Sequence, residues 1–312
     1  MVRDVIVIGG GPAGLAAAQT LGRMRRRTLV LDSGEPRNAP SPAMHNFLSR
    51  DGTPPAELRR IAREEVGRYA SVELRDGRVD AAQFVEEGFE VRLADGERIR
   101  ARRLLLATGL ADELPPIAGL RELWGKRVLH CPYCHGHEVA DGPLAVLGST
   151  APRVRMALLL TRLSKDIVLC PAGEDLPDAE TRAKLGRQGV RVREGEVSAV
   201  EALGEDSVRL RFADGGVLER RALFVQSRPV QRSSLAAELG CDLLEDGSVV
   251  VDEAYRTTVA GVYAAGDMAR RATLHWAASS VIVAAAGGAT AAAVIDQDLL
   301  SADLGLPLPF AG

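Results

Sequence analysis

Residues 4–14 read DVIVIGGGPAG, and this stretch decides the fold. After Asp4, the residues VIVI (5–8) are a continuous apolar run, so that DVIVI is typical of a strand buried on both faces of a parallel sheet. The glycine-rich turn leads into a helix, LAAAQTLGRMRR (residues 15–26), and then into a second strand, RTLVLD (residues 27–32). The order strand, glycine turn, helix, strand predicts a Rossmann-like α/β unit.

Three glycines of this turn match the pattern G-x-G-x-x-G. The first, Gly9, allows a tight turn, and Gly11 lets the backbone approach a pyrophosphate. The third, Gly14, lets the helix pack closely on the strand, while the helix N-terminus faces the phosphates. We therefore expect a dinucleotide to be bound by Gly9, Gly11, Pro12, Ala13 and Gly14.

An acidic residue at the end of the second strand supports the same interpretation. Asp32 is placed to accept hydrogen bonds from a ribose 2′-OH. The glycine motif alone is a weak signal, since glycine-rich turns also serve packing. The strand, the helix and the acid together favour dinucleotide binding over a purely structural turn.

Length and composition exclude several classes of protein. The 312 residues suffice for two domains, and 46% apolar with 26% charged residues is typical of a globular protein in water. A formal charge of −3 does not suggest a nucleic-acid partner. The N-terminus shows no export signal, and the alanine-rich run 276–295 contains glycines, serines and threonines, which favours a buried helix over a membrane span. We expect a cytoplasmic protein.

A second unit repeats the first in outline. PLAVLG (residues 143–148), a helix over 151–164 and the strand DIVLC (residues 166–170) follow one another. Proline-rich LPPIAGL (residues 114–120) and the stretch 241–252 indicate the boundaries. We expect two Rossmann-like three-layer α/β domains, the first formed by 1–114 plus 245–312 and the second, 115–244, inserted into it.

The stretch HCPYCHGHE (residues 130–138) allows three interpretations: a redox dithiol, half of a zinc site, or the attachment point of a c-type haem. Covalent haem needs export and a second axial ligand. Zinc needs four ligands, and Cys170 and Cys241 are isolated in the sequence. A redox dithiol of Cys131 and Cys134 is favoured, and we expect no metal site.

Two later segments complete a family resemblance. RRLLLATGL (residues 102–110) and TTVAGVYAAGD (residues 257–267) resemble the second and third signatures of FAD-dependent pyridine nucleotide–disulfide oxidoreductases. The order of the motifs is similar to that of low-molecular-weight thioredoxin reductases over nearly the full chain. The resemblance implies FAD as the cofactor, a homodimer, and cofactor contacts from Thr108, Gly109, Gly266 and Asp267.

The resemblance also implies roles around the dithiol. Cys134 would exchange electrons with the flavin, and Cys131 would attack an external disulfide or receive a substrate thiol. The family usually has an aspartate after the second cysteine as proton carrier; here His135 stands there and can do the same work. The outer partner would be a small dithiol or disulfide, or a thioredoxin-like protein.

The second unit departs from the family pattern. In GSTAPR (residues 148–153), Thr150 and Arg153 occupy glycine positions of the nucleotide motif. After the next strand, Glu174 and Asp175 stand where arginines would bind a 2′-phosphate, and acids would repel it. We therefore expect NADPH not to be the electron donor.

The motif CPYCHG, together with the degenerate nucleotide motif, resembles the branch of gliotoxin- and holomycin-type dithiol oxidases. Those enzymes pass electrons from a small dithiol to oxygen. Other relatives without NADPH motifs take electrons from ferredoxin, so the direction of electron flow stays open. Two alternatives also stay open: a conventional NADPH-dependent thioredoxin-disulfide reductase, and a non-catalytic flavin-binding redox sensor. His275 and Trp276 either lie against the flavin or pack at a helix start or a dimer surface. The loop 33–52 also borders the flavin by this resemblance, with no single residue assigned.

Overall fold

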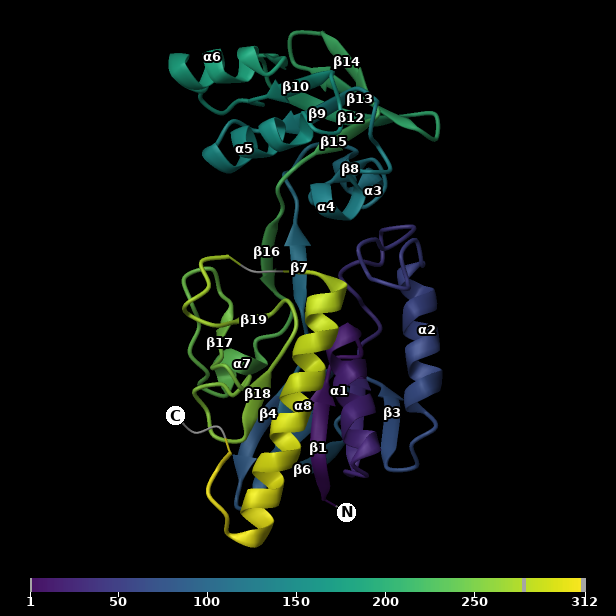
Figure 1. The fold of residues 1–312 in the computed structure, drawn as a ribbon, viewed down its shortest axis with the longest axis vertical. Helices are drawn as coiled ribbons and strands as arrows, with labels where there is room; N and C mark the ends of the chain where they lie inside the picture. The colour runs from purple at the N-terminus through teal and green to yellow at the C-terminus, as the bar shows by residue number, and fades with distance from the viewer. Residues whose placement is uncertain (1, 277–278, 310–312) are drawn as a thin grey trace. The chain divides into compact units, whose positions relative to one another are not determined.

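The computed structural model describes residues 2–276 and 279–309, and the chain forms two compact units (Figure 1). Unit 1 consists of Met1–Ala39, Ala56–Ala111 and Pro229–Gly312, and unit 2 of Pro40–Pro55 and Asp112–Arg228. The strands β7 (Leu110–Glu113) and β16 (Arg228–Gln231), where the chain passes between the units, pair with each other.

Unit 1 is built on a seven-stranded sheet in the order β3-β2-β1-β6-β5-β4, with β18 also paired to β6. Its strands are β1 (Arg3–Ile8), β2 (Thr28–Asp32), β3 (Val72–Asp76), β4 (Val79–Val85), β5 (Gly88–Leu93), β6 (Arg98–Leu106) and β18 (Val262–Ala264). The strands β3, β2, β1, β6 and β18 run parallel, and β4 and β5 are antiparallel. The apolar runs predicted as buried strands form the parallel centre.

Helices cover this sheet: α1 (Pro12–Arg23), α2 (Pro55–Val66), α7 (Leu235–Glu238) and α8 (Val281–Leu304). In Figure 1 the yellow helix α8 lies beside α1, and the contact is so close that a Cβ on Gly288 would stand 1.9 Å from the carbonyl oxygen of Ala13. Among the helices of the described ranges, α8 is the one that is long and apolar enough to cross a membrane. Half of its most apolar 18-residue segment is buried inside the fold. Its packing agrees with the buried helix that the alanine-rich run predicts.

Unit 2 has a parallel sheet in the order β11-β10-β9-β15-β8 and a three-stranded antiparallel sheet. The parallel strands are β8 (Val128–Leu129), β9 (Leu144–Leu147), β10 (Ile167–Cys170), β11 (Val190–Val192) and β15 (Ala222–Phe224). The antiparallel sheet contains β12 (Val197–Leu203), β13 (Ser207–Phe212) and β14 (Val217–Arg220), and the helices are α3 (Leu120–Leu123), α4 (Pro132–His135), α5 (Ala151–Leu160) and α6 (Ala179–Arg187). Two Rossmann-like α/β units are thus present, as the repeat in the sequence predicts.

The division of the chain differs from the expected 1–114 plus 245–312 and 115–244 in two places. The chain returns to unit 1 at Pro229, because Leu235 and Cys241 are buried in the same core cluster as Phe89 of β5. The stretch 241–252 holds a short turn and β17 (Val249–Val250), which pairs with β19 (Ala269–Arg270) of unit 1. The segment Pro40–Pro55 groups with unit 2.

Candidate functional site

The carboxyl ends of four parallel strands of unit 1 bring together the predicted cofactor-binding residues. The strands β1, β2, β6 and β18 run parallel, and their ends lie in register at Ile8, Leu31, Leu106 and Ala264. The glycine turn, Asp32, Thr108–Gly109 and Gly266–Asp267 follow these ends directly. In open α/β sheets, ligands bind outside the carboxyl ends of the strands.

The glycine turn has the geometry that a pyrophosphate needs. A Cβ on Gly9 would stand 2.2 Å from the carbonyl oxygen of Ala107, and one on Gly14 would stand 1.8 Å from that of Gly9, so both positions require glycine. A Cβ on Gly11 would meet nothing within 4 Å, and Gly11 begins α1 without a side-chain cap. Open space in front of uncapped N–H groups fits a phosphate group.

Ala13 and Gly266 lie against each other beside this turn, because a Cβ on Gly266 would stand 3.2 Å from that of Ala13. Gly266 also has a φ of +85°, which glycine adopts without strain. Asp267 receives a hydrogen bond of 2.9 Å from Arg37. Thr108 contacts the sulfur of Met268 at 3.3 Å, and Gly109 has a φ of +67°.

Asp32 is buried, and its carboxylate already has protein partners. One oxygen accepts the N–H of Gly34 at 3.1 Å, and the other lies 2.6 Å from Arg59 and 3.4 Å from Arg63 of α2. Arg59 also donates to the carbonyl oxygen of Gly10, at 3.4 Å. Sequence reasoning missed Arg37 and Arg59, because nothing in the order of residues marks a partner across the fold.

The predicted dithiol is a disulfide between Cys131 and Cys134 in unit 2. Cys131 begins the short helix α4, and its carbonyl oxygen accepts the N–H groups of Cys134 and His135, both at 3.2 Å. A Cβ on Gly136 would stand 2.3 Å from the carbonyl oxygen of Pro132, which explains the glycine of CPYCHG. Between the cysteines, the Tyr133 side chain is 72% exposed, so the disulfide has an aromatic neighbour in solvent.

His135 is partly buried and makes a hydrogen bond through only one ring nitrogen. Its Nε2 lies 2.9 Å from the hydroxyl oxygen of Ser41, and that hydroxyl contacts the carbonyl oxygen of Ala43 at 2.5 Å. The other nitrogen, Nδ1, is buried without a hydrogen-bond partner among the residues described. Burial lowers the pKa of His135, against a smaller opposite effect of Glu138.

A second histidine completes this cluster. The ring of His45 stands edge-on to that of His135, with 6.4 Å between the centroids. Nδ1 of His45 lies 3.4 Å from a carboxylate oxygen of Asp51 and 3.5 Å from one of Glu138. Sequence reasoning found His135 and missed Ser41 and His45, because the loop 33–52 has no periodicity that would assign its residues.

The loop between β9 and α5, where a second nucleotide motif would lie, is occupied by protein groups. Oε2 of Glu174 accepts the N–H of Ser149 at 2.6 Å and lies 3.2 Å from its hydroxyl, which also contacts the backbone carbonyl of Asp175 at 2.6 Å. A Cβ on Gly148 would stand 2.6 Å from Nε of Arg153. Arg153 hydrogen-bonds to the side chain of Gln226.

Cys170 and Cys241 are buried, each in the core of one unit. Burial raises the pKa of Cys170 to about 12, so this thiol is not a nucleophile at neutral pH. Within 2–276 and 279–309, no three His, Cys, Asp or Glu residues cluster to hold a metal ion. His275 and Trp276 have exposed side chains in the segment before α8.

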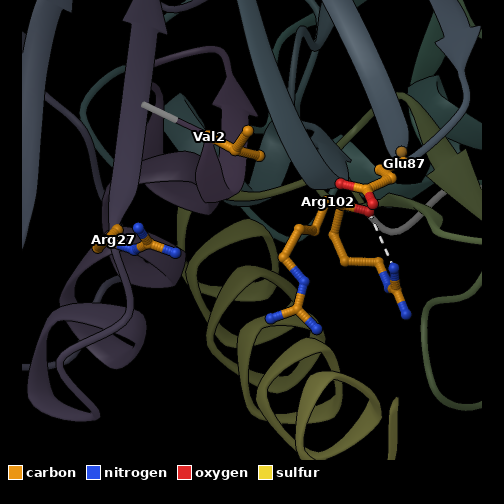
Figure 2. Close-up of a pocket in the computed structure, with 6 residues that line it drawn as sticks. Val2, Arg27, Glu87 and Arg102 are labelled. Atoms are coloured by element: carbon orange, nitrogen blue, oxygen red, sulfur yellow. Dashed lines mark hydrogen bonds between the residues drawn. The ribbon is translucent and has the colours of Figure 1, made fainter. Parts of the chain in front are cut away.

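A pocket of about 410 Å³ lies at the amino end of the unit 1 sheet (Figure 2). Val2, Arg27, Glu87 and Arg102 line it together with Gly88 and Arg103. Arg27 pairs with Asp4 at 3.1 Å, and Arg102 pairs with Asp303. The pocket lies beside the start of β1, whereas the predicted cofactor residues follow the ends of the strands, so none of the predicted residues lines it.

Comparisons with known proteins find relatives over most of the chain. The family described as pyridine nucleotide-disulphide oxidoreductase matches residues 3–288. Thioredoxin reductase tcpT of Claviceps purpurea is 35% identical over 278 residues, covering 85% of this chain and 86% of the relative. The probable thioredoxin reductase of Arthroderma benhamiae is 32% identical over 296 residues, covering 85% of this chain and 73% of the relative.

Solved structures are similar over nearly the full chain. An oxidoreductase from Agrobacterium tumefaciens has a TM-score of 0.89 and 37% identity, covering 96% of this chain and 99% of its own. The structure of HlmI has a TM-score of 0.89 and 41% identity, covering 97% of this chain and 94% of its own.

Proposed function

We propose that this chain, a member of the pyridine nucleotide–disulphide oxidoreductase family, is an FAD-dependent dithiol oxidase. It is a thioredoxin reductase-like flavoprotein that acts on sulfur groups. In this proposal Cys131 and Cys134 pass two electrons from a small dithiol to FAD, and NADPH is not the donor. The outer substrate is a small dithiol, with a thioredoxin-like protein as the alternative partner.

FAD, when bound, supplies the acceptor for two electrons. The residues of unit 1 that would hold it are those of the glycine turn, Asp32, Thr108–Gly109 and Gly266–Asp267. Gly11 would admit the pyrophosphate to the uncapped start of α1, and Arg59 would hold the Asp32 carboxylate beside the turn. Asp32 would then direct its remaining acceptor capacity to the ribose.

The disulfide supplies the thiol chemistry. A substrate thiolate attacks Sγ of Cys131, the bond between the two cysteines breaks, and Cys134 leaves as a thiolate. The second substrate thiol then attacks the mixed disulfide and releases the substrate as a disulfide. His135 carries a proton in this exchange, since its lowered pKa keeps the ring neutral and able to accept.

One observation carries the exclusion of NADPH: the Glu174 carboxylate accepts the N–H of Ser149 in the loop where a nucleotide phosphate would bind. A carboxylate in this place satisfies the donor that a phosphate would use and repels the phosphate charge. Arg153 lies against Gly148, where a glycine-rich turn would leave room for a pyrophosphate.

The electron acceptor downstream of the flavin is proposed to be oxygen, with ferredoxin as the other candidate partner. We also propose a homodimer in the cytoplasm, with neither nucleic acid nor membrane as a partner. The net charge of −3 and the buried side of α8 support the last two points.

The test mixes the oxidised flavoprotein anaerobically with NADPH, NADH or dithiothreitol and follows the flavin absorbance. Dithiothreitol should bleach the flavin, and oxygen should restore its colour. Cys134→Ser should abolish the bleaching, whereas Ser198→Ala, an exposed change on β12, should leave it unchanged.

Two outcomes would contradict the proposal. Rapid bleaching by NADPH would identify a conventional NADPH-dependent thioredoxin-disulfide reductase. A flavin that no dithiol reduces would indicate a non-catalytic flavin-binding redox sensor.

A further inference from the structure

Building on the function proposed above, we propose that Ser41 is a positioning residue that fixes the tautomer of His135 and leaves Nδ1 as the acceptor of the substrate dithiol's proton. Ser41 lies in the segment Pro40–Pro55. This segment groups with the disulfide in unit 2, although the disulfide comes much later in the sequence. The loop therefore lies in the same compact unit as the disulfide.

Two contacts decide where the single hydroxyl proton of Ser41 goes. Its oxygen lies 2.5 Å from the carbonyl oxygen of Ala43 and 2.9 Å from Nε2 of His135. A carbonyl oxygen can only accept, so the hydroxyl donates to Ala43 and Nε2–H of His135 must donate to the hydroxyl. A neutral imidazole with its proton on Nε2 has a bare lone pair on Nδ1.

That lone pair has no donor in the described part of the chain. Nδ1 of His135 is buried without a hydrogen-bond partner. A buried acceptor without a donor costs free energy, and native structures keep few of them. The ring belongs to the residue directly after Cys134, where a proton is released each time a thiol attacks the disulfide. Nδ1 is thus an acceptor without a donor, on the residue that directly follows Cys134.

Burial, and not the charges around it, favours the neutral form of His135. Burial lowers its pKa, Glu138 raises it, and His45 lowers it, with a net decrease. His45 lies between the carboxylates of Asp51 and Glu138, and the exposed His137 stands two residues after His135. The neutral ring that results is the form that accepts a proton near pH 7.

The exchange of protons and electrons then balances. The first substrate thiol forms a bond to Sγ of Cys131, its proton passes to Nδ1 of His135, and the bond between the cysteines breaks to leave Cys134 as a thiolate. The second substrate thiol attacks the mixed disulfide, its proton goes to Sγ of Cys131, and the substrate leaves as a disulfide. The substrate loses two electrons, and the enzyme disulfide gains them as one thiol and one thiolate.

The tautomer can be read directly by ¹⁵N NMR of protein labelled at histidine, since the chain contains only five histidines. A His135→Gln spectrum assigns the signals. The wild type should carry its proton on Nε2, and Ser41→Ala should give a mixture of tautomers. Ser41→Thr keeps the hydroxyl and should restore the wild-type spectrum, and Ser198→Ala should not alter it. A proton on Nδ1 in the wild type, or an unchanged Ser41→Ala spectrum, would overturn the inference.

A kinetic arm follows anaerobic flavin reduction by dithiothreitol. Ser41→Ala should slow it about three- to tenfold, the effect of losing one hydrogen bond, and Ser41→Thr should recover most of the rate. A changed tautomer with an unchanged rate would refute the role of Nδ1. If dithiothreitol does not reduce the wild-type flavin, the proposed function fails and the proton-acceptor role of Nδ1 fails with it. The NMR spectra then still decide whether Ser41 fixes the tautomer.

Discussion

Two loops occupy the same place in the two Rossmann-like units and differ in what their backbone N–H groups do. Between β1 and α1, Gly11 begins the helix without a side-chain cap and faces open space. Between β9 and α5, Thr150 begins the helix, also without a side-chain cap, but Glu174 accepts the N–H of Ser149 at 2.6 Å. The first loop keeps a donor site open, and the second has closed it with a residue of its own.

The difference teaches that fold and phosphate site depend on separate features. Strands such as β1 and β9 lie in a parallel sheet because the apolar runs VIVI (residues 5–8) and LAVL (residues 144–147) can be buried on both faces. The phosphate site needs, in addition, free N–H groups and room for an anion. Unit 2 meets the first requirement, and in its loop the N–H of Ser149 already donates to Glu174.

The largest effect is expected from filling the open loop with Gly11→Val. Gly11 has a φ of −79° and free space around its Cβ position, so the variant should fold. Its side chain would occupy the space of the pyrophosphate and cost about two charge-assisted hydrogen bonds, roughly 3 kcal/mol. FAD affinity should therefore fall about 100-fold, as measured by fluorescence titration of the apoprotein.

The matched control is Gly186→Ala on α6, where an added Cβ also meets nothing within 4 Å. It should bind FAD like the wild type. Wild-type affinity in Gly11→Val would show that the cofactor does not use this loop.

A smaller effect is expected from opening the closed loop with Glu174→Ala. Removing the carboxylate frees the Ser149 N–H and eliminates a negative charge. ADP, which carries the phosphates that this loop would meet, should bind about tenfold more tightly, since one charge-assisted hydrogen bond of about 1.5 kcal/mol becomes available. Calorimetry with ADP measures this gain.

Asp175→Ala is the control for charge alone, because the hydrogen bond between Asp175 and Ser149 uses the backbone carbonyl, which the substitution keeps. It should change ADP affinity less than Glu174→Ala does. Equal gains in both variants would mean that general repulsion, and not the hydrogen bond to Ser149, keeps the nucleotide out.

The fold was predictable because its determinants are local. The apolar run at residues 5–8 and the spacing of Gly9, Gly11 and Gly14 each fix a conformation within a few residues. The return of the chain to unit 1 at Pro229 was not predictable, because it depends on Leu235 reaching a core formed by strands that come much earlier in the sequence.

The candidate site was predictable only where a motif marks it. Cys131, Cys134 and His135 lie within five residues of the sequence, so the motif itself indicates a redox pair beside a proton carrier. Ser41 and His45 contact His135 across about 90 residues and come from a loop without periodicity. The same limit applies to Glu174: its negative charge is visible in the sequence, whereas its hydrogen bond to Ser149 is not.

The smallest effect is expected from changing the charges near His135. It tests whether Nδ1 of His135 accepts a proton from the substrate, as the open loop before α1 is proposed to bind a phosphate. A protonated ring cannot accept a proton, so the rate of flavin reduction by dithiothreitol should rise with pH through the His135 pKa and then level off. Because burial lowers this pKa, the rise should lie below the ordinary range of histidine. Glu138→Gln removes a group that raises the pKa and should move the rise to lower pH, whereas His45→Gln should move it to higher pH, each by less than about one pH unit. Stopped-flow rates are measured with the same dithiol for the wild type and both variants, so that the ionisation of the dithiol affects all three proteins equally. If both variants shift the pH dependence in the same direction, a group other than His135 controls it.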